Sequence, residues 1–502
     1  MQTTTPVAGR ADLRTSATLA ATGNSPAPLR GDYRLTDNLE ASRGTVFLTG
    51  IQALVRLPLM QAALDRARGL NTAGFISGYR GSPLGGYDQA LWKARPMLDN
   101  AGVQFLPAIN EELGGTAVLG SQQVESDPQR TVDGVFAIWY GKGPGVDRAG
   151  DALKHGNAYG SSPTGGVLVV AGDDHGCVSS SMPHQSDLAM QAWSMPVLHP
   201  GNVAEYLEFG LYGWALSRFS GNWVGFKALS EVVESGMTVD LDTVRTHFPP
   251  PAEFVAPDGG LHYRWPDLPS LTIEQRLAAK LDAVRAFARV NSVDRWITRP
   301  EKADLGIVTV GKAHYDFLEV LRRLGLTLTD LEAAGIRIYK VGLVFPLEPT
   351  RIAQLVEGLT EVLVIEEKAP VVERQLHDLL FNRDTRPRVV GKTDAEGRPL
   401  LSALGELRPS RIMPVFAEWL AARKPALDRR EHVIDFTAPP LLSNIADAVR
   451  RLPYFCSGCP HNTSTKVPEG SIAQAGIGCH FMASWMDRAT TGLIQMGGEG
   501  VD

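Results

Sequence analysis

Three of the four cysteines of this chain lie near one another in the sequence, at a spacing that could bind a metal. Cys456 and Cys459 form a Cys-x-x-Cys pair, which brings two thiols to one side of a turn, and Cys479 follows. With His461 or His480 as the fourth ligand, these residues would complete the tetrahedral Cys3His site of a structural zinc. An iron–sulfur cluster would need four thiolates, and this segment supplies three. The spacing therefore leaves zinc, a cluster and a redox thiol pair open.

The elements that position such residues must belong to a multidomain globular chain. The 502 residues are 44% apolar and 21% charged, with a net charge of −6. A chain of this length forms about two to four domains. There is no basic excess that would indicate nucleic acid or an anionic membrane surface as a partner. The longest apolar runs are too short to cross a bilayer. Four cysteines exclude a disulfide scaffold and fit a reducing compartment, so we expect a cytoplasmic protein.

Short apolar segments alternate with helical patterns from about residue 31 onward. Near-continuous apolar segments of this kind predict an α/β fold with a parallel sheet buried on both faces. The expected strands of the first unit are 45–50, 74–79, 103–109, 134–141, 166–172 and 222–229, with a helix over 54–68. A helix over 273–290 leads to a second α/β unit with strands at 305–311, 336–342 and 361–367. The first 30 residues, rich in Thr, Ala, Ser and Pro, are expected to be a disordered tail.

Glycine-rich polar segments follow the expected strands of the first unit directly. They read GYRGSPLGGYD, NEELGG, YGKGPGVDR and GDDHGCVSSSMPHQSD. Active loops of parallel sheets lie beyond the carboxyl ends of the strands, and glycine lets the backbone approach a ligand closely. In NEELGG, a helix capped by Asn110 would by itself explain Glu111 and Glu112, because acids in the first turn oppose the helix dipole. The isolated Cys177 is expected to be a buried apolar thiol.

Several of these motifs, taken in order, resemble those of one enzyme family. FCSGCPHNTST, GIGCHF and MGGEG resemble the start of the thiamine-diphosphate-binding domain of 2-oxoacid:ferredoxin oxidoreductases. GYRGSPLGGYD, INEELGGTAVLGSQ, GKGPGVDRAGDALKHGN and GDDHGCVSSSMPHQSD resemble the pyrimidine-binding domain of the same enzymes. The closest resemblance is to the fused bacterial indolepyruvate ferredoxin oxidoreductases, and it runs from about residue 35 to residue 502.

The resemblance implies a domain organisation. It predicts a tail at 1–30, a pyrimidine-binding domain at 31–260, a transketolase C-terminal-like domain at 270–430, and the start of a diphosphate-binding domain at 440–502. The chain would then be the N-terminal part of a larger enzyme. The Mg²⁺-binding loop and a fourth cysteine of the family would follow residue 502.

The resemblance also assigns cofactor-binding residues. Glu111 takes the place of the carboxylate that binds the pyrimidine N1′ of thiamine diphosphate, with Glu112 as the alternative. A carboxyl group there performs a general acid–base step on the cofactor. Further cofactor contacts are expected at Gly478, His480, Gly497, Gly498 and Glu499, and a 4Fe-4S cluster at Cys456, Cys459 and Cys479.

Substrate-binding residues are expected in the neighbouring loops. Ser82 stands where relatives carry a threonine hydroxyl near the 2-oxoacid, and Lys154 or His155 would bind the substrate carboxylate. Arg80 is a weaker candidate for the same role. His175 and His184 would shape the pocket, although a histidine in a loop is more often only a hydrogen-bonding residue. These last two residues therefore keep both interpretations.

The implied reaction is the oxidative decarboxylation of an arylpyruvate, indolepyruvate first, to the aryl-acetyl-CoA with ferredoxin as electron acceptor. Thiamine diphosphate, Mg²⁺ and the 4Fe-4S cluster are the implied cofactors, and coenzyme A is a co-substrate. The implied partners are a second copy, or a chain carrying the remaining domains, with neither nucleic acid nor membrane involved. Two other classes stay open: a non-catalytic module that binds a partner chain, and a module stabilised by zinc.

Overall fold

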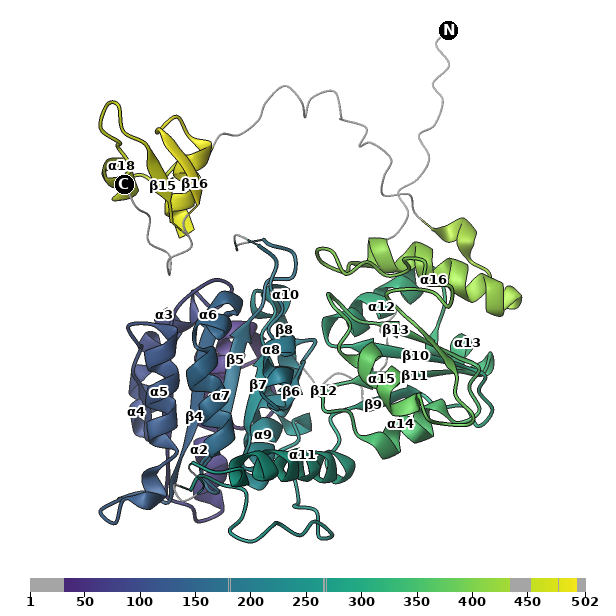
Figure 1. Cartoon of the computed structure of the whole chain (residues 1–502), viewed down its shortest axis with the longest axis horizontal. Coiled ribbons are helices and arrows are strands. Elements are labelled where there is room, and N and C mark those ends of the chain that lie inside the picture. Colours follow the sequence, from purple (N-terminus) through teal and green to yellow (C-terminus); the bar gives the residue numbers. More distant parts are fainter. Residues whose placement is uncertain are drawn as a thin grey trace.

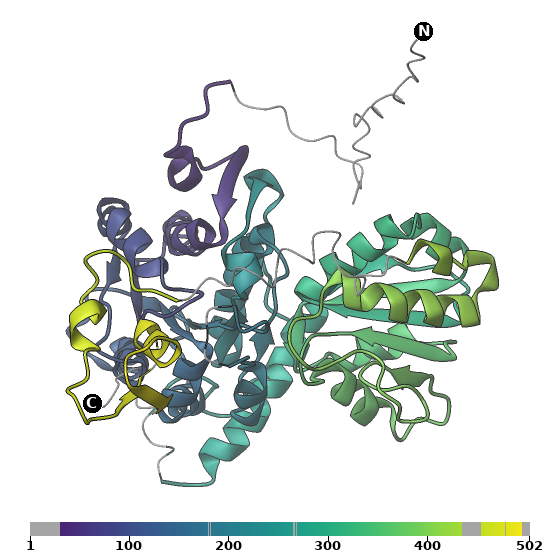
Figure 2. The same cartoon turned by 90° about the horizontal axis from the view of Figure 1, so that it is seen from above.

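The computed structural model describes residues 31–178, 180, 182–264, 267, 269–433, 453–476 and 478–493. Within them two parallel sheets with flanking helices form two α/β units (Figure 1). Figures 1 and 2 show the second unit, in green, beside the first, in purple to teal. The predicted α/β class with buried parallel sheets is confirmed. No helix in these ranges is both long enough and apolar enough to span a bilayer.

The first unit is built on a seven-stranded sheet in the order β12-β6-β7-β5-β4-β2-β3. Every neighbouring pair is parallel except β12 and β6, which are antiparallel. Its strands are β2 (Thr72–Gly78), β3 (Val103–Phe105), β4 (Gly134–Lys142), β5 (Val167–Gly172), β6 (Val197–Leu198), β7 (Trp223–Lys227) and β12 (Leu343–Phe345).

Helices cover both faces of this sheet. α2 (Gly50–Ala67) and α9 (Val203–Ser220) pack together on one face, whereas α5 (Glu111–Ser121), α6 (Gly143–Arg148) and α7 (Gly150–Tyr159) pack on the other. Shorter helices of this unit are α1 (Asp37–Glu40), α3 (Tyr87–Lys93), α4 (Arg95–Asn100), α8 (Asp187–Ala192) and α10 (Ser230–Val233).

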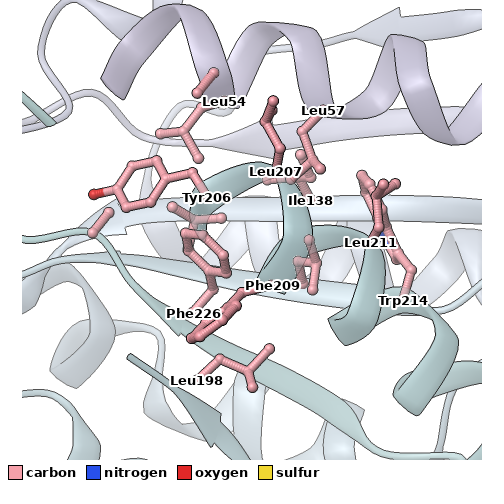
Figure 3. Close-up of a cluster of buried hydrophobic side chains, with 14 of the residues drawn as sticks. Leu54, Leu57, Ile138, Leu198, Tyr206, Leu207, Phe209, Leu211, Trp214 and Phe226 are labelled. Atoms are coloured by element: carbon pink, nitrogen blue, oxygen red, sulfur yellow. The ribbon is translucent and has the colours of Figure 1, made fainter. Parts of the chain in front are cut away.

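Strand alternation divides the core between the two faces. In β4, Ile138 and Tyr140 join the α2–α9 cluster, while Ala137 and Trp139 face α5 and α7. Figure 3 shows leucines of α2 meeting aromatic and aliphatic side chains of α9 above the sheet. Each fully buried side chain of this size stabilises the fold by roughly 1.5–3 kcal/mol. The core therefore fixes the strand ends that carry the loops.

The second unit has a five-stranded sheet in the order β14-β13-β10-β11-β9. All its neighbouring strands are parallel except β9, which is antiparallel to β11. Its strands are β9 (Arg295–Thr298), β10 (Leu305–Val310), β11 (Ile336–Val341), β13 (Glu361–Ile365) and β14 (Arg388–Val390). Its helices are α12 (Lys312–Arg323), α13 (Leu328–Ala333), α14 (Pro349–Val356), α15 (Val372–Leu380) and α16 (Pro409–Arg423), and α11 (Thr272–Val290) precedes it.

One predicted strand lies outside the parallel sheets. β1 (Thr45–Thr49) pairs antiparallel with β8 (Gly236–Asp240) in a two-stranded sheet of its own. Val46 and Leu48 are buried, but Phe47 between them is 52% exposed. Only one face of β1 is therefore buried, which is the pattern of an antiparallel strand. The expectation that 45–50 opens the parallel sheet was wrong.

The segment that carries the cysteine cluster is small and mostly irregular. It contains α18 (His461–Ser464), β15 (Ala473–Ala475), the 3-10 helix η6 (Gly478–Trp485) and β16 (Thr490–Leu493). β15 and β16 are parallel neighbours. Its buried apolar residues are few, so short turns and hydrogen bonds set the positions of the thiols.

Candidate active site

The predicted loops meet at the carboxyl edge of the seven-stranded sheet. In the parallel register Gly78 at the end of β2 pairs with Tyr140 in β4, and Lys142 at the end of β4 pairs with Gly172 at the end of β5. α5 packs directly on the end of β2, because a Cβ atom at Gly114 would lie 3.0 Å from the Cα atom of Gly78. The loops after three adjacent strands and the start of α5 therefore form one rim.

Glu111, the first residue of α5, is buried at this rim, with only 7% of its surface exposed. Its backbone carbonyl accepts a 2.9 Å hydrogen bond from Nε1 of Trp139, and Asn110 caps the helix by accepting from Leu113 N at 2.9 Å. Its side chain lies against Gly145 of α6, where an added Cβ atom would come within 2.8 Å of Oε1. Glu111 is thus anchored by the main chain, and the glycine leaves room for its carboxylate.

The charge of Glu111 has a single nearby counterion among the described residues. Arg148 Nε lies 3.7 Å from Oε2 of Glu111, and the arginine side chain is 45% exposed. At this distance the contact is an ion pair without a short hydrogen bond, so the carboxylate keeps acceptor capacity for a ligand. Glu112, in contrast, is exposed on the outer side of α5. Glu111 is buried and Glu112 is exposed, so Glu111 is the better candidate for the carboxylate that binds the cofactor.

His184 lies over the end of β4, in contact distance of the Gly143 position. Its Nε2 is 2.9 Å from Oδ2 of Asp147 and its Nδ1 is 3.3 Å from Oδ1 of Asp173. Burial lowers the pKa of His184, but the hydrogen bonds to Asp173 and Asp147 raise it by more, and the net pKa is above the ordinary value. His184 therefore joins the loop after β5 to α6, and its raised pKa favours the charged form of this link. It forms part of the rim and has a defined hydrogen-bonding role, and its contribution to a substrate pocket stays a prediction.

A buried ion network that the sequence analysis missed supports this loop. Lys227, at the end of β7, is 2.7 Å from Asp187 and 3.6 Å from Asp173. His175 Nδ1 is 2.9 Å from Glu367 of the second unit, and its Nε2 is 3.3 Å from Nζ of Lys227. Burial lowers the pKa of Lys227, yet the two aspartates raise it by more. A lysine inside the apolar segment NWVGFKAL was the available signal, since a buried lysine needs a paired acid.

The predicted substrate residues occupy different surroundings. Ser82 lies half-buried in the loop after β2. The two residues that follow it, Pro83 and Leu84, pack against Gly172 at the end of β5. Lys154 and His155 are exposed on α7, and His155 Nδ1 is 3.1 Å from Oδ1 of Asp151. Arg80 is exposed. The structure therefore brings Ser82 to the rim with Glu111, while the roles of Lys154 and His155 stay predictions.

The cysteine segment contains residues that can bind a metal, but the side chains that the structure describes do not come together in one site. Cys456 and Cys479 are exposed, and Cys459 is half-buried. The Sγ atom of Cys459 lies 3.2 Å from Nδ1 of His461. Among the described residues no three His, Cys, Asp or Glu side chains come together as metal ligands. Within the described part of the chain these donors thus form neither a closed zinc site nor a cluster site.

The other predicted cofactor contacts are only partly described. Gly478 begins η6 with φ +85°, and His480 Nδ1 accepts a 3.1 Å hydrogen bond from Gly476 N. Gly497, Gly498 and Glu499 lie outside the described residues. Cys177 is half-buried and its Sγ is 2.8 Å from the carbonyl oxygen of Ser180. The expectation of a buried apolar thiol was wrong, because Cys177 sits in a polar loop at the rim.

Comparisons with known proteins point to one group of enzymes. Residues 295–435, which contain the second unit, match the family model of the indolepyruvate oxidoreductase domain. The chain is 24% identical over 458 residues to indolepyruvate oxidoreductase subunit IorA of Pyrococcus abyssi, an alignment of 87% of this chain and 62% of the relative. It is 24% identical over 451 residues to the same subunit of Methanothermobacter marburgensis, covering 88% of this chain and 63% of the relative. The chain thus spans less than two thirds of the length of these relatives.

A solved structure shares the fold. The 2-oxoglutarate:ferredoxin oxidoreductase of Magnetococcus marinus, with 2-oxoglutarate, coenzyme A and succinyl-CoA bound, superposes with a TM-score of 0.51 at 15% identity. The match covers 75% of this chain and 65% of that one. The resemblance predicted from the motifs is therefore confirmed: along most of its length the chain is similar to indolepyruvate oxidoreductase subunits, and residues 295–435 match the model of the indolepyruvate oxidoreductase domain.

Proposed function

We propose that this chain forms the pyrimidine-binding part of a thiamine-diphosphate-dependent enzyme that oxidatively decarboxylates an arylpyruvate such as indolepyruvate. Coenzyme A would accept the acyl group and ferredoxin the electrons. The similarity to IorA subunits and the order of the motifs support the reaction class. The observation that carries the proposal is Glu111, a buried acid at the carboxyl edge of the sheet whose neighbour Glu112 is exposed.

The surroundings of Glu111 fit the aminopyrimidine half of the cofactor. The carboxylate is buried, its main chain is anchored by Trp139, and the missing side chain of Gly145 leaves space beside Oε1. Thiamine diphosphate, when bound, supplies the nucleophilic carbon that adds to the 2-oxo group and accepts the electron pair as CO2 leaves. Glu111 would hold a proton in common with the pyrimidine N1′, a general acid–base role in a site with little water.

Apolar surface next to Glu111 supports a second domain covering the site. Ile109 is 84% exposed, Leu106 is 52% and Leu113 is 50%, all on the segment from β3 to α5. Exposed apolar groups that cluster beside a binding site are typical of interaction surfaces. We propose that a diphosphate-binding domain, from a second copy or a partner chain, covers this surface and supplies the Mg²⁺ ligands.

The test is Glu111→Gln in the complete enzyme, with Glu112→Gln as the matched control. Glutamine keeps the shape of the side chain, but its amide cannot exchange a proton with N1′, so turnover of indolepyruvate should fall by about 10²–10⁴-fold. The control should keep most of the activity, and both variants should melt close to the wild type. Binding of thiamine diphosphate by isothermal titration calorimetry gives a second readout, since Glu111→Gln should also weaken it.

Other outcomes would contradict the proposal in identifiable ways. If Glu112→Gln is inactive and Glu111→Gln is active, the assignment is wrong by one residue. Full activity in both variants would exclude a cofactor role for this loop. A wild-type enzyme that neither binds thiamine diphosphate nor consumes any 2-oxoacid would refute the proposed reaction, and a partner-binding role would then replace it.

A further inference from the structure

Lys142, the last residue of β4, is a half-buried cation at the rim. Its ammonium group makes no hydrogen bond or ion pair with the part of the chain that the structure describes. Its aliphatic chain passes over Gly81, where an added Cβ atom would lie 2.9 Å from Cδ and 3.1 Å from Cγ of the lysine. The side chain of Lys142 is therefore held against the loop that carries Ser82, the residue after Gly81.

Three other cations at or near the rim already have partners, and Arg80, in the loop after β2, is exposed to solvent. Arg148 pairs with Glu111, and His184 lies between Asp147 and Asp173. Lys227, on the neighbouring strand β7, is buried and paired with Asp187 and Asp173. A partly desolvated ammonium without a counterion is unfavourable in the absence of a ligand. Its position thus indicates an anion that arrives from outside the described chain.

We propose that Lys142 binds the carboxylate of the 2-oxoacid substrate. This inference rests on the proposed function and deepens it by naming the residue that recognises the charge of the substrate. Lys142 is the N-cap of α6 and Gly145 lies in its first turn, and Gly145 is the residue against which the Glu111 carboxylate lies. A 2-oxoacid reacting beside a cofactor held by Glu111 would therefore place its carboxylate close to this turn.

A monoanion fits this position better than a diphosphate. A single ammonium can neutralise one carboxylate, whereas a diphosphate needs several cationic groups or a metal ion. Another cation of the rim, Arg148, is paired with Glu111. The exposed Lys154, predicted from the sequence, lies on the outer surface of α7, where solvent screens its charge. Lys142 is the more strongly desolvated cation of the two.

If Lys142 binds the substrate carboxylate, it should affect substrate binding more than the chemical step. The carboxylate loses its charge as CO2 departs, so the contact with Lys142 weakens along the reaction and supports binding more than catalysis. In the complete enzyme Lys142→Met should raise KM for indolepyruvate by about 10- to 100-fold, the range of one hydrogen bond to a charged group, and change kcat little. Methionine retains the packing on Gly81. Lys93→Met, on the exposed face of α3, is the matched control and should leave both constants unchanged.

Direct binding separates this inference from the proposed function. Titration calorimetry would compare indolepyruvate with its methyl ester, which lacks the negative charge. Wild type should prefer the acid, Lys142→Met should lose the preference, and Lys142→Arg should restore part of it. If wild type binds and turns over the acid but Lys142→Met keeps the preference, the Lys142 inference is overturned and the proposed function stands. The Lys142 inference is equally overturned if Lys154→Met alone removes the preference. If wild type binds no 2-oxoacid, both proposals fail together.

Discussion

Charge pairing decides how individual side chains at the rim behave. Glu111 and Arg148 form an ion pair at 3.7 Å, without a short hydrogen bond. His184 lies between two aspartates, and Lys142 has no counterion among the described residues. Paired groups hold the loops in place, because breaking a pair leaves an uncompensated charge. An unpaired group is available to a ligand. The rim therefore combines paired charges that hold the loops with the half-buried Lys142, which is available to a ligand.

The raised pKa of His184 should make the stability of the fold depend on pH. Its pKa is raised in the folded protein, so its contribution is fully present below the ordinary histidine pKa and is lost as pH rises through the raised value. His184→Gln should cost about 1–2 kcal/mol of unfolding free energy at pH 6. Urea unfolding of both proteins from pH 5.5 to 8.5 should show this difference shrinking as pH rises. A difference that stays constant or grows over this range would refute the charged link.

Helix α2 meets its neighbours too closely for a side chain at its first residue. A Cβ atom at Gly50 would lie 2.5 Å from the Cα atom of Val233 and 2.6 Å from the carbonyl oxygen of Val232. Because these are backbone atoms, Gly50→Ala should destabilise the protein by about 1–3 kcal/mol through overpacking. Gly86→Ala is the control, since nothing lies within 4 Å of the added atom. Thermal unfolding should show a lower midpoint for the first variant only, and equal midpoints would mean that α2 can shift.

The sequence predicted the elements whose signal is local. β10, β11 and β13 are short, mostly apolar segments, and their predicted positions agree with the structure. β6 and β12 are too short to show a period, and they form a strand pair only because distant segments meet. Local patterns could not place β1 either, since its partner β8 is far along the chain.

The same limit applied to the site. Glu111 was assigned from the family resemblance. Only the folded structure shows that Glu111 is buried while Glu112 is exposed. The network of Lys227, His175 and Glu367 joins three separate segments, so no spacing in the sequence could reveal it. Lys142 was overlooked for a similar reason, because lacking a partner is a property of the folded surroundings.

At the scale of the whole molecule, the two α/β units are joined by more than a linker. One hydrophobic cluster contains Val169 of the first sheet and Tyr339 of the second. The hydrogen bond between His175 and Glu367 connects the rim to the second unit, and Glu367 also lies 3.5 Å from Lys312. The second unit therefore supports the loop after β5, and through it the surroundings of His184.

The metal content of the complete enzyme tests the role of the cysteine segment. If Cys456, Cys459 and Cys479 bind a 4Fe-4S cluster once all domains are assembled, protein purified without oxygen should contain iron and absorb broadly near ~400 nm, and dithionite should bleach this absorption. Cys456→Ser and Cys479→Ser should each lose most of the iron, whereas Cys177→Ser, at the rim of the first unit, should keep it. Stoichiometric zinc in place of iron would favour the structural zinc module.

The pairing of β12 with β6 has a consequence for synthesis of the chain. β12 is the outermost strand of the first sheet, yet its residues Leu343–Phe345 follow three strands of the second unit in the sequence. While the ribosome is still extending the second unit, Val197 and Leu198 of β6 present unpaired backbone groups at a sheet edge. The sheet of the first unit is completed only after Phe345 has left the ribosome.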